Sequence, residues 1–101
     1  MNEVLYISVI LPLRLEWEPC YAVAKEAKIE VGDRVRVKFG AKEYVGVVSA
    51  VGITPEIDPK RIFPIISVES DLEKIYQEEI RLWRYIAEYY MCSIGEVYKA
   101  A

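Results

Sequence analysis

The sequence predicts a mainly β fold with C-terminal helices: a small curved sheet or open β-barrel of roughly four to six short strands, packed by an amphipathic helix and a short terminal helix. Three observations lead to this fold class. Short apolar or alternating segments, separated by Gly and Pro, fill residues 1–68. Residues 69–101 then change to a helical period. The length of 101 residues and the 53% hydrophobic content fit a single domain, residues 1–101, with a β-barrel part followed by a helical part.

The barrel part begins with a predicted strand over residues 3–10, "EVLYISVI", which is rich in β-branched and aromatic residues. We expect this strand to be central and Pro12 to end it. The next segment, "LRLEWEP", has no clean period, and Pro19 is incompatible with a central strand. Residues 13–19 are therefore predicted to form an irregular loop, followed by a short strand "CYAV" at residues 20–23.

Two runs of period-two alternation flank a glycine turn in "GDRVRVKFGAKEYVGVV" and predict a β-hairpin. Its strands should cover residues 33–39 and 43–51, joined through "GAK" by a loop of roughly three to five residues. Gly46, inside the second strand, indicates a bulge or a close backbone approach. One face of the first strand is basic and carries Arg34, Arg36 and Lys38. The opposite face is apolar and carries Val35, Val37 and Phe39.

The basic face of the hairpin has two interpretations. Such a face is usually a solvated surface. On small barrels it can also follow a phosphate backbone, particularly beside aromatic side chains that stack on bases. The aromatic candidates are Trp17, Tyr21, Tyr44 and Phe63. From the strand pattern we expect Tyr21 and Tyr44 to be buried, and Trp17, between two glutamates, to expose its ring.

The hairpin is followed by a proline-bracketed loop and one more apolar segment. The loop is "TPEIDPKR", residues 54–61. The segment "IFPIISV", residues 62–68, reads as a strand whose Pro64 indicates an edge position or a bulge.

The helical part contains apolar and aromatic residues at helical spacing, which predict an amphipathic helix over residues 71 to about 90. These residues are Leu72, Ile75, Tyr76, Ile80, Trp83, Ala87 and Tyr90. Ser70 with Glu73 matches a capping box at the helix start, and Ser93 with Glu96 matches a second one that opens a short terminal helix. Tyr89 and Tyr90 are expected to finish a packed helix, and Gly95 to permit close helix packing.

Composition argues against an enzyme. The sequence has no histidine and two separated cysteines, so the commonest general base and the usual zinc ligand sets are missing. No P-loop is present. The pairs Glu16 with Glu18 and Glu78 with Glu79 are interpreted as solvated charges. No nucleophile–base pair is visible, so we expect no catalytic residue, no metal and no cofactor.

Charge and cysteine usage restrict the partners and the compartment. The whole net charge of −3 falls in residues 69–101, because acidic and basic residues balance before them. An anion-binding surface must therefore be local and lie in the first two thirds of the chain. Cys20 and Cys92 are expected to be reduced thiols of a cytoplasmic protein, since no signal peptide or membrane-length apolar run is visible.

Four stretches, in order, resemble the N-terminal domain of the bacterial replication-restart helicases, the PriA family of primosomal proteins. They are "ILPLRLEWEPCYAV", "VGDRVRVKFGAKEYVGVV", "IFPIISV" and "LWRYIAEYYMCSIGEV". The resemblance implies a non-catalytic, monomeric DNA-binding module at the front of a longer helicase. In the family, this module recognises the 3′ end of a nascent strand at a stalled fork, without regard to sequence. The resemblance also implies that the motor and the ATP, Mg and Zn sites lie in downstream domains. The implied partners are DNA, the helicase domains and other primosome proteins in the bacterial cytoplasm.

The resemblance also implies a pocket for the terminal nucleotide. An aromatic–acidic–aromatic triplet of the family falls on Pro19, Cys20 and Tyr21, its turn glycine on Gly40, and a lysine on Phe63. Only Tyr21 and Gly40 match. In this interpretation Gly40 lets the backbone approach the sugar, and Tyr21 stacks on any base.

Nearby residues can replace the lost groups. Glu18 is a candidate hydrogen-bond acceptor in place of the missing carboxylate, and Lys60 or Arg61 a candidate cation in place of the lysine. The basic strand face, made by Arg34, Arg36 and Lys38, would hold the adjoining phosphates. A protein-interaction module of the small-barrel type, with weak or no DNA binding, is the alternative function that the sequence leaves open.

Overall fold

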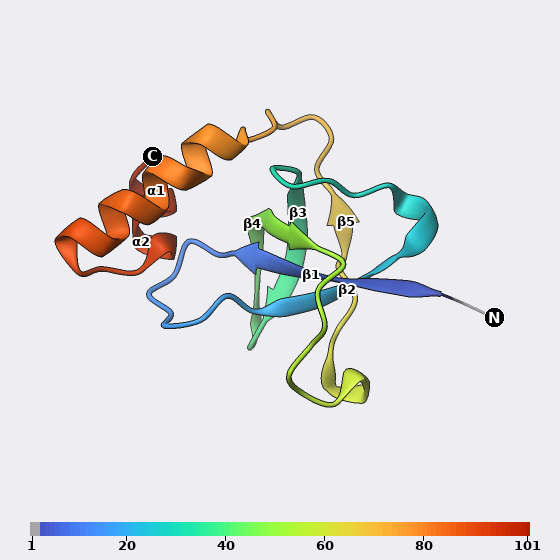
Figure 1. Cartoon of the computed structure of the whole chain (residues 1–101). Helices are drawn as coiled ribbons and strands as arrows, with labels where there is room; N and C mark the ends of the chain where they lie inside the picture. Colours follow the sequence, from blue (N-terminus) through green and yellow to red (C-terminus); the bar gives the residue numbers. More distant parts are fainter. Residues whose placement is uncertain (1–2) are drawn as a thin grey trace.

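The computed structural model describes residues 3–101 and shows a five-stranded antiparallel sheet curled into a half-barrel, followed by two helices (Figure 1). The predicted fold class is confirmed. The strands are β1 (Val4–Ile10), β2 (Cys20–Ala24), β3 (Arg34–Phe39), β4 (Lys42–Val51) and β5 (Ser67–Val68), and the helices are α1 (Gln77–Tyr90) and α2 (Ile94–Ala100). Short 3-10 turns cover Lys25–Ala27 and Pro59–Arg61. Residues 1–2 of the predicted domain lie outside the described residues.

The sheet has the order β2-β1-β4-β3-β5, so the predicted central position of β1 is confirmed. The alternation read from the hairpin is also confirmed, because Val35 and Val37 are fully buried while Arg34, Arg36 and Lys38, which alternate with them, are half-buried or exposed. Ile7 and Val9 of β1 meet these valines in the barrel core. The period-two pattern therefore fixes which face of β3 carries charge.

The segment before β5 connects the two edges of the sheet. The Ala22 N–H of β2 donates to the Phe63 carbonyl at 3.0 Å, and the Ile65 N–H donates to the Ala22 carbonyl at 3.0 Å. One residue later, the Ile66 N–H donates to the Arg36 carbonyl of β3 at 2.7 Å. Residues 65 and 66 bond to different strands, β2 and β3, and Pro64 has no N–H to donate, so this segment cannot continue a single strand. The predicted strand over residues 62–68 is therefore wrong in length, because only Ser67–Val68 form β5.

Gly46 lies where the end of β1 closely approaches its neighbour β4 in the sheet. A Cβ atom at this position would collide with the Val9 side chain and stand 2.8 Å from the Ile10 carbonyl oxygen. The predicted close backbone approach is therefore confirmed. The bulge lies elsewhere, because the pairing shifts between Ser8 and Val9 and leaves Ser49 of β4 as the extra residue.

Helix α1 begins at Gln77, later than predicted, and the expected capping box of Ser70 with Glu73 does not form. Its N-cap residue is Tyr76, without a side-chain cap. The Ile75 N–H donates instead to the Gly32 carbonyl at 2.9 Å. This bond holds the chain before Tyr76 against the barrel, so the helix begins only after it. The inward stripe is confirmed at Ile80, Trp83 and Ala87, whereas Leu72 and Tyr76 are exposed because they precede the helix.

Helix α2 starts at the predicted capping box. The Ser93 hydroxyl accepts the Glu96 N–H at 3.3 Å, and the Glu96 carboxylate accepts the Ser93 N–H at 3.1 Å. Gly95 packs on the loop after β1, where a Cβ atom would collide with the carbonyl oxygens of Leu11 and Leu13. The expected close approach at Gly95 is therefore made to the barrel loop and not to a helix.

A second apolar cluster attaches both helices to the barrel. The Trp83 ring packs against the Tyr98 ring with centroids 5.3 Å apart, and both rest on Ile10 and Val47. None of the helices within residues 3–101 combines the length and the apolar character that a membrane crossing requires.

Candidate nucleic-acid interface

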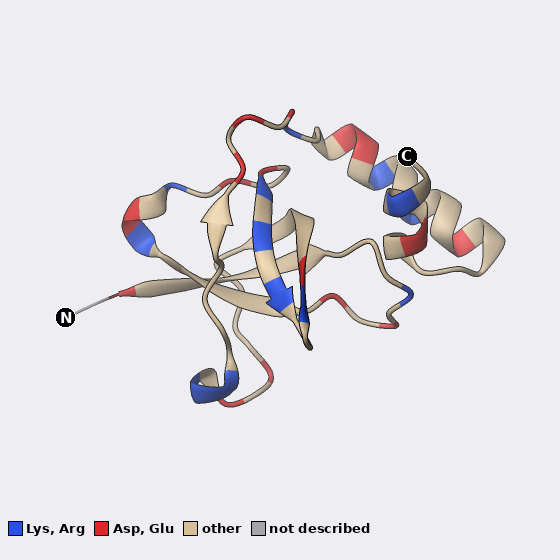
Figure 2. Ribbon diagram, turned by 180° about the vertical axis from the view of Figure 1, so that it is seen from behind, with Lys and Arg blue, Asp and Glu red and all other residues tan. Residues whose placement is uncertain are grey.

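The basic residues of β3 line one face of the hairpin (Figure 2), but two of the three have partners within the domain. Arg36 is neutralised, because its Nη2 lies 2.8 Å from the Glu69 carboxylate and its Nη1 3.9 Å from Glu43. The pattern predicted the position of this cation. It did not predict that two carboxylates would compete with a phosphate for it.

Arg34 attaches helix α2 to the hairpin. Its guanidinium lies 5.5 Å from the centroid of the Tyr98 ring, and its Nη2 donates to the Tyr98 hydroxyl at 3.0 Å. That hydroxyl in turn donates to the Val45 carbonyl at 2.9 Å. The predicted phosphate contact at Arg34 is therefore replaced by a structural role, since the guanidinium packs over an aromatic face.

Four cations of the hairpin and of the segment before Phe63 are exposed: Lys38, Lys42, Lys60 and Arg61. Within residues 3–101 none of them takes part in an ion pair. Lys42 was not among the predicted contacts, because we assigned it to the hairpin loop. A two-residue turn after Phe39 places this lysine at the start of β4, where it pairs with Phe39, while Glu43 pairs with Lys38.

Two hydrogen bonds bring the predicted pocket residues together. The Tyr21 hydroxyl donates to the Lys38 carbonyl at 2.8 Å, which joins β2 to the end of β3 just before the turn. The bond from Ala22 to Phe63 joins the same part of β2 to the segment before β5. We call the place where these three stretches meet the hairpin-turn site, formed by Cys20, Tyr21, Gly40 and Phe63.

Gly40 forms an open turn at this site. The hairpin pairs Phe39 with Lys42, so its loop contains only Gly40 and Ala41, and the expected loop of three to five residues is wrong. Gly40 has a φ of +65°, and no heavy atom from beyond its chain neighbours lies within 4 Å of the position that a Cβ atom would take. A positive φ at the first loop residue only is the pattern of a type II′ turn. The backbone is therefore accessible to a ligand.

The roles of the two aromatic residues differ from those implied by the resemblance. The Tyr21 ring is 3% exposed, so it offers no face to a base, and the expectation that it stacks on DNA is wrong. Burial raises the pKa of Tyr21 to about 12. Phe63, by contrast, is 69% exposed. The hairpin-turn site therefore presents one accessible ring, at the position where the family has a lysine.

Neither candidate acceptor side chain is well suited to a terminal hydroxyl. Burial by itself raises the pKa of Glu18, but hydrogen bonds from Arg84 and Ser49 hold the pKa below its usual range. Both oxygens of this carboxylate are engaged, with Arg84 donating at 3.0 and 3.1 Å. The expectation that Glu18 replaces the family's acceptor is therefore wrong, because the residue fastens the loop to α1. Burial raises the pKa of the Cys20 thiol, which keeps it protonated and a weak partner.

A small β-barrel with an open hairpin turn, an exposed aromatic ring and exposed cations has the features of the binding modules built on small barrels. The comparison with known families identifies which kind of binding module this is. The model of the 3′ DNA-binding domain (3′BD) of PriA matches residues 8–101, so the chain belongs to this family. It is a DNA-binding module, and a binding domain of this kind is not itself catalytic.

Proposed function

We propose that this chain recognises the 3′ end of a nascent strand at a stalled replication fork, independently of base sequence, for primosome assembly and replication restart. The proposal includes a parent cytoplasmic helicase whose other domains hold ATP, Mg and Zn and contact other primosome proteins. The observation that supports it best is the hairpin-turn site, with its exposed Phe63 ring and open Gly40 backbone, together with four exposed cations that form no ion pair within residues 3–101.

The recognition has three parts. The Phe63 ring stacks on the last base, which any base permits because every base has a π-face. The Gly40 turn lets the backbone approach the terminal sugar and accept its hydroxyl, since no side chain fills that space. The cations Lys38, Lys42, Lys60 and Arg61 hold the adjoining phosphates and replace the basic strand face as the electrostatic surface.

End recognition is tested with two oligonucleotides of one sequence, one with a free 3′-hydroxyl and one with a 3′-phosphate. We expect the free hydroxyl to bind about tenfold more tightly, because the capped end loses the hydrogen bond that the hydroxyl donates to the turn backbone. Fluorescence anisotropy measures both affinities at several salt concentrations. Equal affinities, with salt-dependent binding retained, would show a DNA-binding module that does not read the end.

Phe63→Ala is expected to weaken binding of the free-ended oligonucleotide by about 5- to 150-fold, because stacking contributes about 1–3 kcal/mol per base. The matched control is Ile66→Ala, which removes another exposed apolar side chain from the same segment. Both variants should keep the thermal stability of the parent chain, since neither side chain belongs to the core. An unchanged affinity for Phe63→Ala would contradict the stacking role.

A further inference from the structure

The turn between α1 and α2 carries an exposed aromatic and apolar cluster that DNA binding does not explain. Tyr85, Tyr89, Tyr90 and Met91 are all exposed, and Met91 reaches 93%. The rings of Tyr85 and Tyr89 stack with centroids 6.2 Å apart, and Tyr90 meets Tyr89 edge-on at 5.0 Å. We call these three rings the tyrosine ridge. The expectation that Tyr89 and Tyr90 finish a packed helix is wrong, because both rings face solvent.

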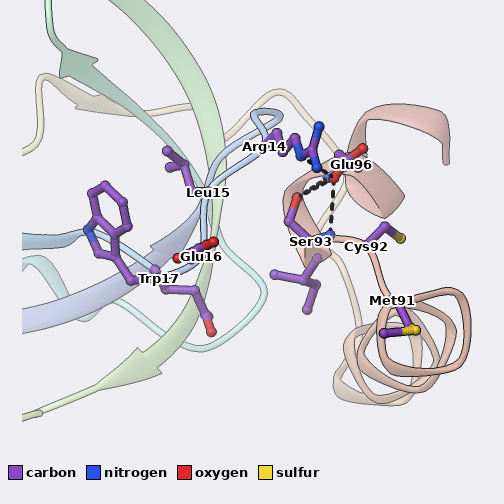
Figure 3. A pocket seen from close by; sticks show the side chains of 10 residues that line it. Arg14, Leu15, Glu16, Trp17, Met91, Cys92, Ser93 and Glu96 are labelled. Atoms are coloured by element: carbon purple, nitrogen blue, oxygen red, sulfur yellow. Dashed lines mark hydrogen bonds and ion pairs between the residues drawn. The ribbon is translucent and has the colours of Figure 1, made fainter.

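Met91 also lines a groove of about 400 Å³ between the loop after β1 and the α1–α2 turn. Figure 3 shows Leu15 and Trp17 on one wall and Met91 and Cys92 on the other. The Trp17 ring is exposed, as predicted. We call this the corner groove. Its volume falls within the usual range for a binding pocket, and contiguous exposed apolar side chains of this kind mark interaction sites.

The charges around the corner groove favour a cation. The last turn of α1 contains Glu88 and no basic residue, although the helix dipole already makes that end negative. Glu16 lines the opposite wall, and Arg14 on the same wall lies 3.9 Å from the Glu96 carboxylate. Within residues 3–101 neither Glu16 nor Glu88 forms an ion pair, whereas Glu18 and Glu96 are paired with arginines. The exposed faces of the tyrosine ridge attract cations as well.

We propose that the corner groove and the tyrosine ridge form a docking site for a protein segment with a bulky apolar side chain next to Lys or Arg. The apolar side chain enters the groove beside Met91. The neighbouring cation lies over the tyrosine ridge, near Glu88 and the carboxyl end of α1. The α1–α2 turn lies at the left of Figure 1, and the β3–β4 hairpin turn lies at the bottom of the sheet. A partner can therefore be held while DNA occupies the hairpin-turn site.

Two substitutions each remove one side chain of the proposed docking site while the domain stays folded. Met91 has a φ of +55°, a left-handed conformation that glycine adopts without a steric penalty. Met91→Gly therefore deletes the apolar contact and should raise the melting temperature. Glu88→Lys replaces a repulsive charge at the end of α1 by a favourable one and should also raise it. A loss of binding in these variants cannot then result from unfolding.

The test is selection of a randomised displayed peptide library against the intact chain, followed by synthesis of the enriched peptides. We expect a shared bulky apolar residue beside Lys or Arg, and binding at least about tenfold weaker to each variant. An oligonucleotide with a free 3′ end should not displace these peptides. The proposal is overturned by acidic or unrelated peptides, by unchanged affinity in both variants, or by displacement with the oligonucleotide.

Discussion

Trp83→Ala is expected to lower the free energy of unfolding by about 3–5 kcal/mol. The side chain is 5% exposed and fills the space between α1, α2 and the barrel, where its ring packs on Tyr98, Ile10 and Val47. Alanine leaves a cavity that the rigid strands β1 and β4 cannot close. Because small domains are stable by only about 5–15 kcal/mol, this one change should remove a large share of the total.

Urea denaturation followed by far-UV circular dichroism measures the effect of Trp83→Ala, with the midpoint falling and the slope unchanged. The melting temperature should fall by at least about 12 °C. Leu82→Ala is the matched control, since Leu82 precedes Trp83 in α1 and is exposed. Its effect should stay within about 0.5 kcal/mol. Similar losses for the two variants would contradict the inward position of Trp83.

The elements that the sequence predicted well are those whose pattern is local. The alternation around Val35 and Val37 required no distant information, because one buried face determines the register of a strand. The Ser93 capping box is equally local, since its two partners lie three residues apart. Strand pattern also correctly predicted burial of Tyr21, whereas the family resemblance alone gave this residue a stacking role.

The errors come from contacts that join distant parts of the chain. The start of α1 is displaced because Ile75 bonds to Gly32, a partner that no helical period reveals. Arg36 is neutralised by Glu69, and Glu18 is occupied by Arg84 from a helix much later in the sequence. The candidate site could therefore be predicted as a region, from its glycine turn and its cations. The sequence could not show which side chains of the site are free and which are engaged, because that distinction depends on tertiary ion pairs.

Alkaline pH should destabilise this domain through Tyr21. Burial raises the pKa of its hydroxyl from an ordinary value of 10.0 to about 12. Between these values the unfolded chain has released the proton and the folded chain still holds it, so stability falls as pH rises. The contribution of the Tyr21 hydroxyl to the free energy of unfolding is complete below pH 10 and is lost as the pH passes about 12. At about 1.4 kcal/mol per pKa unit, the loss amounts to about 2–3 kcal/mol.

Urea denaturation from just below pH 10 to about pH 12 measures this loss, and Tyr21→Phe is the matched control because it keeps the buried ring and removes the ionisable group. At neutral pH this variant should be about 0.5–1.5 kcal/mol less stable, since it lacks the hydrogen bond to the Lys38 carbonyl. Across the alkaline window it should lose about 2–3 kcal/mol less than the parent chain. Parallel profiles for the two proteins would mean that the hydroxyl ionises as freely in the folded chain as in water. In that case Tyr21 would not be the buried support that holds the hairpin turn beside Phe63.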